Sequence, residues 1–148
     1  MEKRRVAIAS DHAGFQIKEK LVRFLIKEGY EVKDFGCFSE ESVDYPDFGH
    51  QLANSLERRE SEVGFSICGS GNGINMTVNK HQSLRSALCW NAEITRLARS
   101  HNDANVCSIP GRFVSEAEAI LIATTFLNTP FEGGRHKIRI DKIPHKTI

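Results

Sequence analysis

A glycine-rich loop that begins with a cysteine is the part of this sequence best suited to chemistry. Residues 68–73 read Cys-Gly-Ser-Gly-Asn-Gly and directly follow the apolar run 63–67. The alternating glycines allow close approach to the backbone, and a helix expected to continue to about Lys80 adds the free amide groups of its first turn. Such a loop stabilises negative charge, which makes Cys68 a candidate nucleophile or general base. A cysteine that ends a buried strand can instead be a small packing residue, and both interpretations stay open.

The spacing of this loop argues against a nucleotide site. It lacks the Gly-Lys-Ser/Thr ending of a P-loop, and it reads GxGxG where dinucleotide-binding loops read GxGxxG, because residue 74 is isoleucine. We therefore expect an anion or oxyanion cradle.

Asp11 and His12 form a second candidate group, directly after the apolar run 5–9. If this strand and the strand before Cys68 are neighbours in a parallel sheet, all three side chains should project at the same sheet edge. A carboxylate and an imidazole at that place suit proton transfer. Asp11 could also cap the helix that begins near Gly14, and His12 could be an ordinary exposed loop histidine.

The segment His101-Asn102-Asp103 lies just before the fifth expected strand. On its own it indicates a helix C-terminus followed by a turn, with Asn102 favoured for the left-handed position.

Cations follow near the end of the chain, with Arg112 after the fifth strand and a basic segment over residues 135–139. Arg135 and Arg139 would lie one turn apart on a helix, which suits a phosphate group, although a solvated basic face is the commoner role of such a run.

Apolar runs alternate with helical periodicity along the whole chain, a pattern typical of α/β proteins. Strands are expected over residues 5–9, 30–35, 63–67, 85–89 and 105–109, with helices between and after them, including one that Gly29 ends, one with Pro46 in its first turn and one that a capping box over residues 115–118 begins. We predict a single-domain Rossmann-like sandwich over residues 1–148. Its five-stranded parallel sheet has strand order 2-1-3-4-5 and helices on both faces. The tail from residue 133 is expected to form an arm toward a partner subunit.

Composition sets further limits. The chain has 148 residues, 40% of them hydrophobic, and a formal net charge of +1. No overall field draws it to nucleic acid or to an anionic membrane, and no apolar run approaches a membrane span or a signal-peptide core. We expect a cytosolic protein with neither kind of partner.

The four cysteines, at positions 37, 68, 89 and 107, contain no CxxC pair. A zinc knuckle and a dithiol redox motif are therefore not indicated, and reduced thiols are expected. Cys37, Cys89 and Cys107 are interpreted as packing residues because none adjoins an anion-stabilising loop.

Taken together, several short motifs resemble the sugar-phosphate isomerase family that contains type B ribose-5-phosphate isomerase and the galactose-6-phosphate isomerase subunits. The resemblance spans roughly residues 5–140, with consistent order and spacing, and its motifs are Ser10-Asp-His-Ala-Gly14, Asp44-Tyr-Pro46, Cys68 to Ile74, Asn79-Lys80, His101 to Asn105, Gly111-Arg112 and Glu132-Gly-Gly-Arg-His136.

The resemblance implies interconversion of ribose 5-phosphate and ribulose 5-phosphate through a cis-enediolate, without a metal or an organic cofactor. Cys68 would carry the proton between C2 and C1. Some family members have a glutamate where this chain has Ile74, which supports Cys68 as the base. Ser70 would hydrogen-bond near the thiol or the substrate, and backbone amides would stabilise oxyanion charge, namely those of Gly69, Gly71, Asn72 and Gly73.

Further roles follow from the same resemblance. His101, with Asp11 nearby, would open the sugar ring, while Tyr45 and Asn102 would hold hydroxyl groups. The phosphate would be bound by His12, Arg135 and Arg139, with help from Arg112. The family's site lies between subunits, which implies a homodimer, or a dimer of dimers, in which His101, Asn102 and Arg112 come from the partner of the chain that supplies Cys68.

Three alternatives remain at this stage. The substrate could be a six-carbon aldose phosphate, such as allose 6-phosphate or galactose 6-phosphate. The chain could be a non-catalytic sugar-phosphate sensor, although binding alone needs no enolising base such as Cys68. A flavodoxin-like electron carrier is suggested by strand order alone, which is weak support.

Overall fold

The structure is a computed structural model, and it describes residues 4–146. The strands are β1 (Arg5–Ser10), β2 (Glu31–Asp34), β3 (Val63–Cys68), β4 (Ser86–Leu88) and β5 (Val106–Pro110). The helices are α1 (Phe15–Lys27), α2 (Tyr45–Glu57), α3 (Asn72–Val78), α4 (Ala92–Ser100), α5 (Glu116–Asn128) and α6 (Arg135–Ile140), with a 3₁₀ turn over His12–Gly14.

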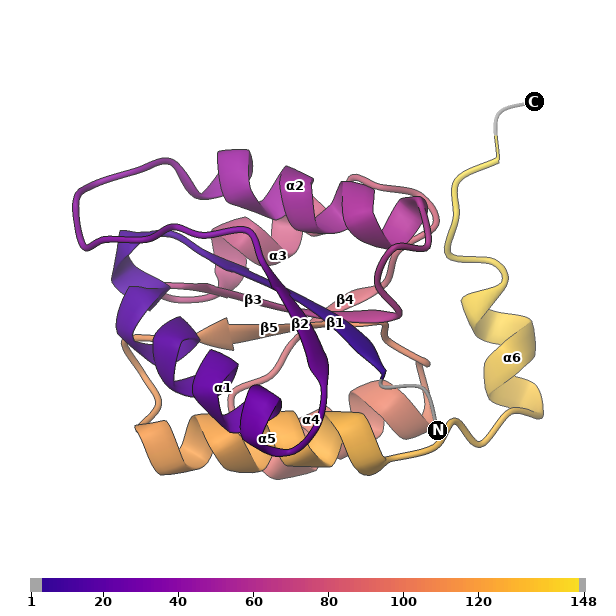
Figure 1. Cartoon of the computed structure of the whole chain (residues 1–148). Helices are drawn as coiled ribbons and strands as arrows, with labels where there is room; N and C mark the ends of the chain where they lie inside the picture. The colour runs from indigo at the N-terminus through magenta and orange to yellow at the C-terminus, as the bar shows by residue number, and fades with distance from the viewer. Residues whose placement is uncertain (1–3, 147–148) are drawn as a thin grey trace.

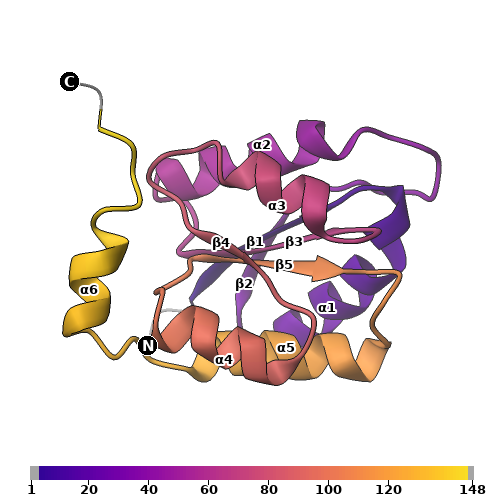
Figure 2. The ribbon, with the colours of Figure 1, turned by 180° about the vertical axis from the view of Figure 1, so that it is seen from behind.

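All strand pairs in the sheet are parallel, and two layers of helices enclose it. Figure 1 shows α2 and α3 on one face and α1, α4 and α5 on the other, and Figure 2 shows the same layers from behind. β1 lies beside β3, with Ser10 opposite Ile67. The predicted three-layer α/β architecture is thus confirmed, and so is the adjacency of the first and third strands.

The predicted strand order 2-1-3-4-5 is wrong at its end, because the observed order is β2-β1-β3-β5-β4. Burial explains the difference. Every residue of β5 is buried, as suits a strand with neighbours on both sides, whereas β4 has three residues that are all partly exposed. The short strand therefore occupies the edge, and the chain passes over β5 to reach it.

Local signals place most helix ends where the sequence predicts them. The capping box of Ser115 and Glu118 opens α5 with both of its hydrogen bonds formed. Gly29 follows the end of α1 with φ +95°, and Pro46 lies in the first turn of α2. After α4, Asp103 rather than Asn102 adopts the left-handed conformation, with φ +46°.

A buried charge that the sequence analysis did not anticipate organises the loop after β2. Lys18 is fully buried, and its ammonium group donates to Asp34 at 2.7 Å and to Glu19 at 2.8 Å. The other oxygen of Asp34 accepts from the Gly36 amide at 2.9 Å. The burial cost of Lys18 is thus offset by paired carboxylates, and the same contacts fix the start of the loop that leads to Tyr45.

The last helix, α6, lies outside the three layers. It stands beside the sheet edge at which the strands begin (Figure 1). Whether this arm reaches a partner subunit stays a prediction. Among the helices of residues 4–146, none is both long and apolar enough to cross a membrane.

Candidate active site

Cys68 is the last residue of β3 and is 5% exposed. The glycine loop follows Cys68 and ends at Gly71, which is the N-cap of α3. Gly71 has φ +77°, a left-handed conformation that favours glycine. Within the loop, the amide and the side-chain Nδ2 of Asn72 donate to Ser70 Oγ at 3.3 and 3.2 Å. The Ser70 hydroxyl proton therefore remains available, whereas the Asn72 amide already has an acceptor.

Tyr45 packs directly on this loop. Its ring lies so close to Gly73 that a Cβ at residue 73 would overlap the ring carbons and approach the hydroxyl. Gly73 is thus needed because it has no side chain, which lets an aromatic ring from α2 lie against the first turn of α3. This requirement is separate from the flexibility of the loop. Tyr45, predicted to hold a sugar hydroxyl, is brought to the loop that carries Cys68.

Asp11 lies at the end of β1, next to the end of β3. Its amide donates to the Ile67 carbonyl at 3.2 Å, and its Oδ1 accepts from Ala13 and Gly14 at 3.0 and 3.1 Å. The capping role is therefore present, and the side chain is nearly buried. Oδ2 is not used by these bonds, so capping and a role beside Cys68 are compatible.

The imidazole of His12 is held by the loop that follows β2. Its Nδ1 accepts a hydrogen bond from the Val43 amide at 3.1 Å. A nitrogen that accepts carries no proton, so the proton of the neutral ring resides on Nε2, which can donate to a ligand. Through Nε2, His12 can thus act as a hydrogen-bond donor to the phosphate that the sequence analysis assigns to it.

The position of Arg112 differs from the expectation that a partner subunit supplies it. Its amide donates to the Gly69 carbonyl at 3.0 Å, and the Gly111 amide donates to the Cys68 carbonyl at 2.9 Å. The guanidinium group lies alongside Gly69 of the same chain. The prediction that Arg112 reaches the site from a partner subunit is therefore wrong in this structure, because β5 ends directly beside β3 and delivers Arg112 to its own loop.

His101 and Asn102 lie at the opposite edge of the sheet. They follow α4, which runs back from the end of β4 to the start of β5, and the Asn102 carbonyl accepts from Arg85 Nε at 2.9 Å, just before β4 begins. A six-residue strand such as β3 spans roughly 17 Å between these two edges. One chain thus does not bring His101 to Cys68.

The basic tail belongs to the same edge as His101. Arg135 and Arg139 are exposed on α6, four residues apart, as predicted for a helical segment. A cavity of about 350 Å³ opens nearby, with Asn102, Arg85 and Ile143 in its lining. His12 and the two arginines, predicted to share one phosphate, are therefore not neighbours within one chain.

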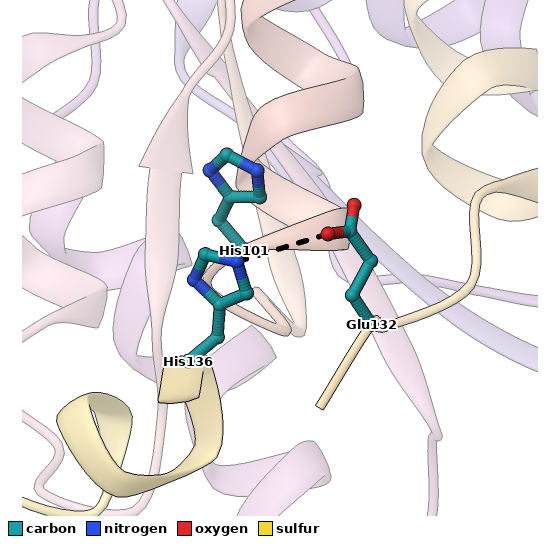
Figure 3. Close-up of side chains that lie close together, drawn as sticks. All are labelled: His101, Glu132 and His136. Atoms are coloured by element: carbon teal, nitrogen blue, oxygen red, sulfur yellow. Dashed lines mark ion pairs between the residues drawn. The ribbon is translucent and has the colours of Figure 1, made fainter. Parts of the chain in front are cut away.

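His136 contacts His101, which the sequence analysis did not foresee. The rings stack with centroids 4.2 Å apart and planes inclined by 12°, and His136 Nε2 lies 3.7 Å from Glu132 Oε1 (Figure 3). His136 was recognised only as one cation among several in the tail. The motif Glu132-Gly-Gly-Arg-His136 was the available signal, but no sequence pattern connects it to residue 101.

The three side chains offer ligand atoms within 4.8 Å of one another, which raises the question of a metal site. Imidazole nitrogens bind a metal along lone pairs in the ring plane, at about 2.0–2.1 Å for zinc. In two nearly parallel stacked rings these directions do not converge on one point between the rings. The cluster as arranged is therefore a stacked histidine pair beside a carboxylate.

The surroundings of His136 lower the pKa of its imidazole. Burial lowers its pKa, the charges of His101, Arg135 and Arg139 lower it further, and only Glu132 opposes them.

The remaining cysteines fit the packing role predicted for them. All four thiols are free and buried. Burial raises the pKa of the Cys107 thiol well above its usual range, and its hydrogen bond to Cys89 lowers the pKa of Cys89. Cys37 Sγ donates to the Ser39 carbonyl at 3.2 Å.

Comparison with known families settles the relationship of the chain. Residues 6–143 match the family described as "Ribose/Galactose Isomerase". The chain belongs to the ribose/galactose isomerase family.

Members of this family with solved structures share the fold over nearly the whole chain. A ribose 5-phosphate isomerase of Thermotoga maritima is 46% identical, has a TM-score of 0.94, and the match covers 97% of this chain and 99% of that one. Ribose-5-phosphate isomerase B of Mycoplasma genitalium, solved with bound ribulose 5-phosphate, is 37% identical with a TM-score of 0.92, over 97% and 95% of the two chains.

A relative found by sequence is ribose-5-phosphate isomerase B of Escherichia coli K12. It is 36% identical over 140 residues, which cover 95% of this chain and 94% of that protein.

Proposed function

We propose that this protein is an aldose–ketose isomerase that interconverts ribose 5-phosphate and ribulose 5-phosphate. The observation that carries the proposal is the group at the carboxyl edge of the sheet, where Cys68 begins a glycine loop flanked by Asp11 and Arg112. The family relationship supports the reaction class, and the named activity of the relatives supports the substrate.

The proton transfer is assigned to Cys68. Its thiolate takes the C2 proton of the open aldose, and the C2–H electron pair forms the C1–C2 double bond of a cis-enediolate as negative charge moves to O1. The resulting thiol then returns the proton to C1 while the O2 hydroxyl proton passes to O1, which leaves the C2 carbonyl of the ketose. Negative charge develops on the substrate oxygens, where the backbone amides of the glycine loop stabilise it. The free proton of the Ser70 hydroxyl is available to donate to the same oxygens.

Ring opening and phosphate binding need groups from both sheet edges. We assign the acid–base role in ring opening to His101 of the partner subunit. The phosphate would be bound by His12 and Arg112 of one chain and by Arg135 and Arg139 of the partner subunit, which amends the predicted source of Arg112. A bidentate guanidinium clamp suits a phosphate better than a single ammonium group.

The shared site follows from the distance between the edges. Because one chain separates Cys68 from His101 by the length of the sheet, a complete site needs a second copy of the chain, as in a homodimer with two equivalent sites or in a dimer of dimers. The cytosolic location stays a prediction from the sequence.

The direct test is conversion of ribose 5-phosphate to ribulose 5-phosphate in the presence of a chelator, in parallel with allose 6-phosphate and galactose 6-phosphate. We expect turnover of the five-carbon sugar that Cys68→Ala abolishes while phosphate binding persists. Turnover of a six-carbon sugar alone would move the function to the hexose branch of the family. Binding without turnover would support the sensor alternative, and full activity of Cys68→Ala would refute the mechanism.

A further inference from the structure

The loop between α5 and α6 is built to bring His136 onto His101. The Glu132 amide donates to the Ser100 carbonyl at 3.0 Å, which attaches the loop to the end of α4. Gly133 and Gly134 both have positive φ, +73° and +58°, and reverse the chain so that α6 begins at once. The His136 amide then donates to the Gly133 carbonyl at 3.2 Å. The position of His136 is thus set by backbone contacts with the segment that carries His101.

His101 depends on this contact for its orientation. Its backbone amide donates to Leu97, but within residues 4–146 no hydrogen bond reaches its imidazole nitrogens. The aromatic contact with His136, at 4.2 Å and 12°, is the interaction that defines the plane of the ring. Both nitrogens of His101 remain free to exchange protons with a ligand.

The surroundings of His136 lower its pKa. Burial is the largest cause, the charges of His101, Arg135 and Arg139 act in the same direction, and Glu132, whose carboxylate lies 3.7 Å from His136 Nε2, opposes them. Two imidazolium rings stacked face to face would repel each other. The surroundings of His136 therefore disfavour its protonation.

We infer that His136, itself oriented by Glu132, is a positioning residue that holds the His101 ring in the plane needed to transfer a proton during sugar ring opening. This inference rests on the proposed function, because it assumes that His101 opens the ring. His136 acts through His101, so it should matter for the closed aldose ring and matter little for the enolisation carried out by Cys68.

Two reactions of the whole enzyme separate these steps. Conversion of ribose 5-phosphate requires an opened ring, whereas exchange of a C1 proton of ribulose 5-phosphate for solvent deuterium requires enolisation alone, since this ketose has no free 5-hydroxyl with which to close a furanose. We expect His136→Ala to lower kcat for ribose 5-phosphate by about tenfold to a hundredfold, the range expected when a catalytic group is misplaced by about 1 Å. Deuterium exchange into ribulose 5-phosphate should change by less than about threefold, because enolisation uses other groups.

Conservative variants distinguish positioning from a structural role. His136→Phe keeps a stacking ring without a titratable group and should restore most of the turnover lost in His136→Ala. Glu132→Gln should give a smaller loss of ribose 5-phosphate turnover, again without loss of exchange. His50→Ala, which removes an exposed histidine of α2, is the matched control and should leave both reactions unchanged.

Two results would overturn the inference about His136. Unchanged ribose 5-phosphate turnover in His136→Ala would overturn the inference. A parallel loss of turnover and exchange would also overturn it, because it would assign His136 to substrate binding or to folding. Failure of the proposed function would look different, since the unaltered protein would then catalyse neither reaction.

Discussion

The two edges of the sheet, to which the proposed function assigns different steps, are built in different ways. At the carboxyl edge, Cys68 and Asp11 are nearly buried and are held by backbone hydrogen bonds between adjacent strand ends. At the amino edge, His101 and the arginines of α6 are partly or fully exposed, and they are held by a ring stack and a loop attachment.

This difference suits each edge to a different step of the proposed reaction. The carboxyl edge of a parallel sheet gathers loop backbone and helix starts, which suit an enolising base and an oxyanion cradle. The amino edge offers long cationic side chains on a helix outside the layers, which suit a mobile, charged substrate group and a ring oxygen. Under the proposed function each half is incomplete alone, and the distance between them means that a complete site would need two copies of the chain.

The largest effect expected from this comparison is complementation between two inactive variants. Cys68→Ala removes one half-site and His101→Asn removes the other, so each homodimer should be inactive. If the two are unfolded together and refolded at equal concentration, half of the dimers are mixed and each has one intact site, so about a quarter of the wild-type activity should return.

Separately refolded variants mixed afterwards serve as the control. No recovery, with mixed dimers verified by differently tagged chains, would place the whole site within one chain. Light scattering of the unaltered protein measures the assembly directly.

A second prediction concerns the phosphate, which we expect to be held from both edges. Arg135→Ala should raise KM for ribose 5-phosphate by about tenfold or more with a smaller change in kcat, because a charge-assisted contact made in ground and transition states is lost. Arg112→Ala should behave similarly, although it comes from the other edge. Steady-state kinetics measures both, and Lys137→Ala, whose ammonium pairs with Asp141 on the exposed side of α6, is the control.

If only one of the two arginine variants changes KM, the phosphate lies at one edge and the two-edge arrangement is wrong. Restored KM in Arg135→Lys would indicate that charge alone is sufficient.

A third prediction tests the packing of the carboxyl edge. Gly73→Ala introduces a Cβ into the Tyr45 ring and should destabilise the protein by about 1–3 kcal/mol, as overpacking does, and lower turnover by displacing Tyr45. Urea unfolding measures the stability. The double variant with Tyr45→Ala should recover much of that stability. Equal stability of Gly73→Ala and the unaltered protein would show that the ring moves without cost.

The smallest effect is the pH dependence at the amino edge. The pKa of His136 in the folded protein is lower than its usual value of 6.5. As the pH falls past that value, the unfolded chain takes up the proton before the folded protein does, so folding loses stability on the acid side. His136→Gln should therefore lose less stability than the unaltered protein on acidification, as measured by unfolding at several pH values. A steeper loss in the variant would contradict the sign of the shift.

The sequence determined those features that depend on residues close together in the chain. The capping box at Ser115, the helix end at Gly29 and the glycine loop after Cys68 each depend on a few consecutive residues, and all are found as predicted. The approach of Asp11 to the end of β3 was also predictable, because it follows from a general rule of parallel sheets once two strands are taken as neighbours.

Tertiary structure decided the rest, because these features depend on contacts between distant segments. The order of β4 and β5 was set by burial across the whole sheet, and that order placed Arg112 beside Gly69 of its own chain. The pairing of buried Lys18 with Asp34, and the stack of His136 on His101, join residues with no shared local pattern. The sequence thus determined which chemical groups the protein has, and the packing of the folded chain decided which of them lie at the same edge of the sheet.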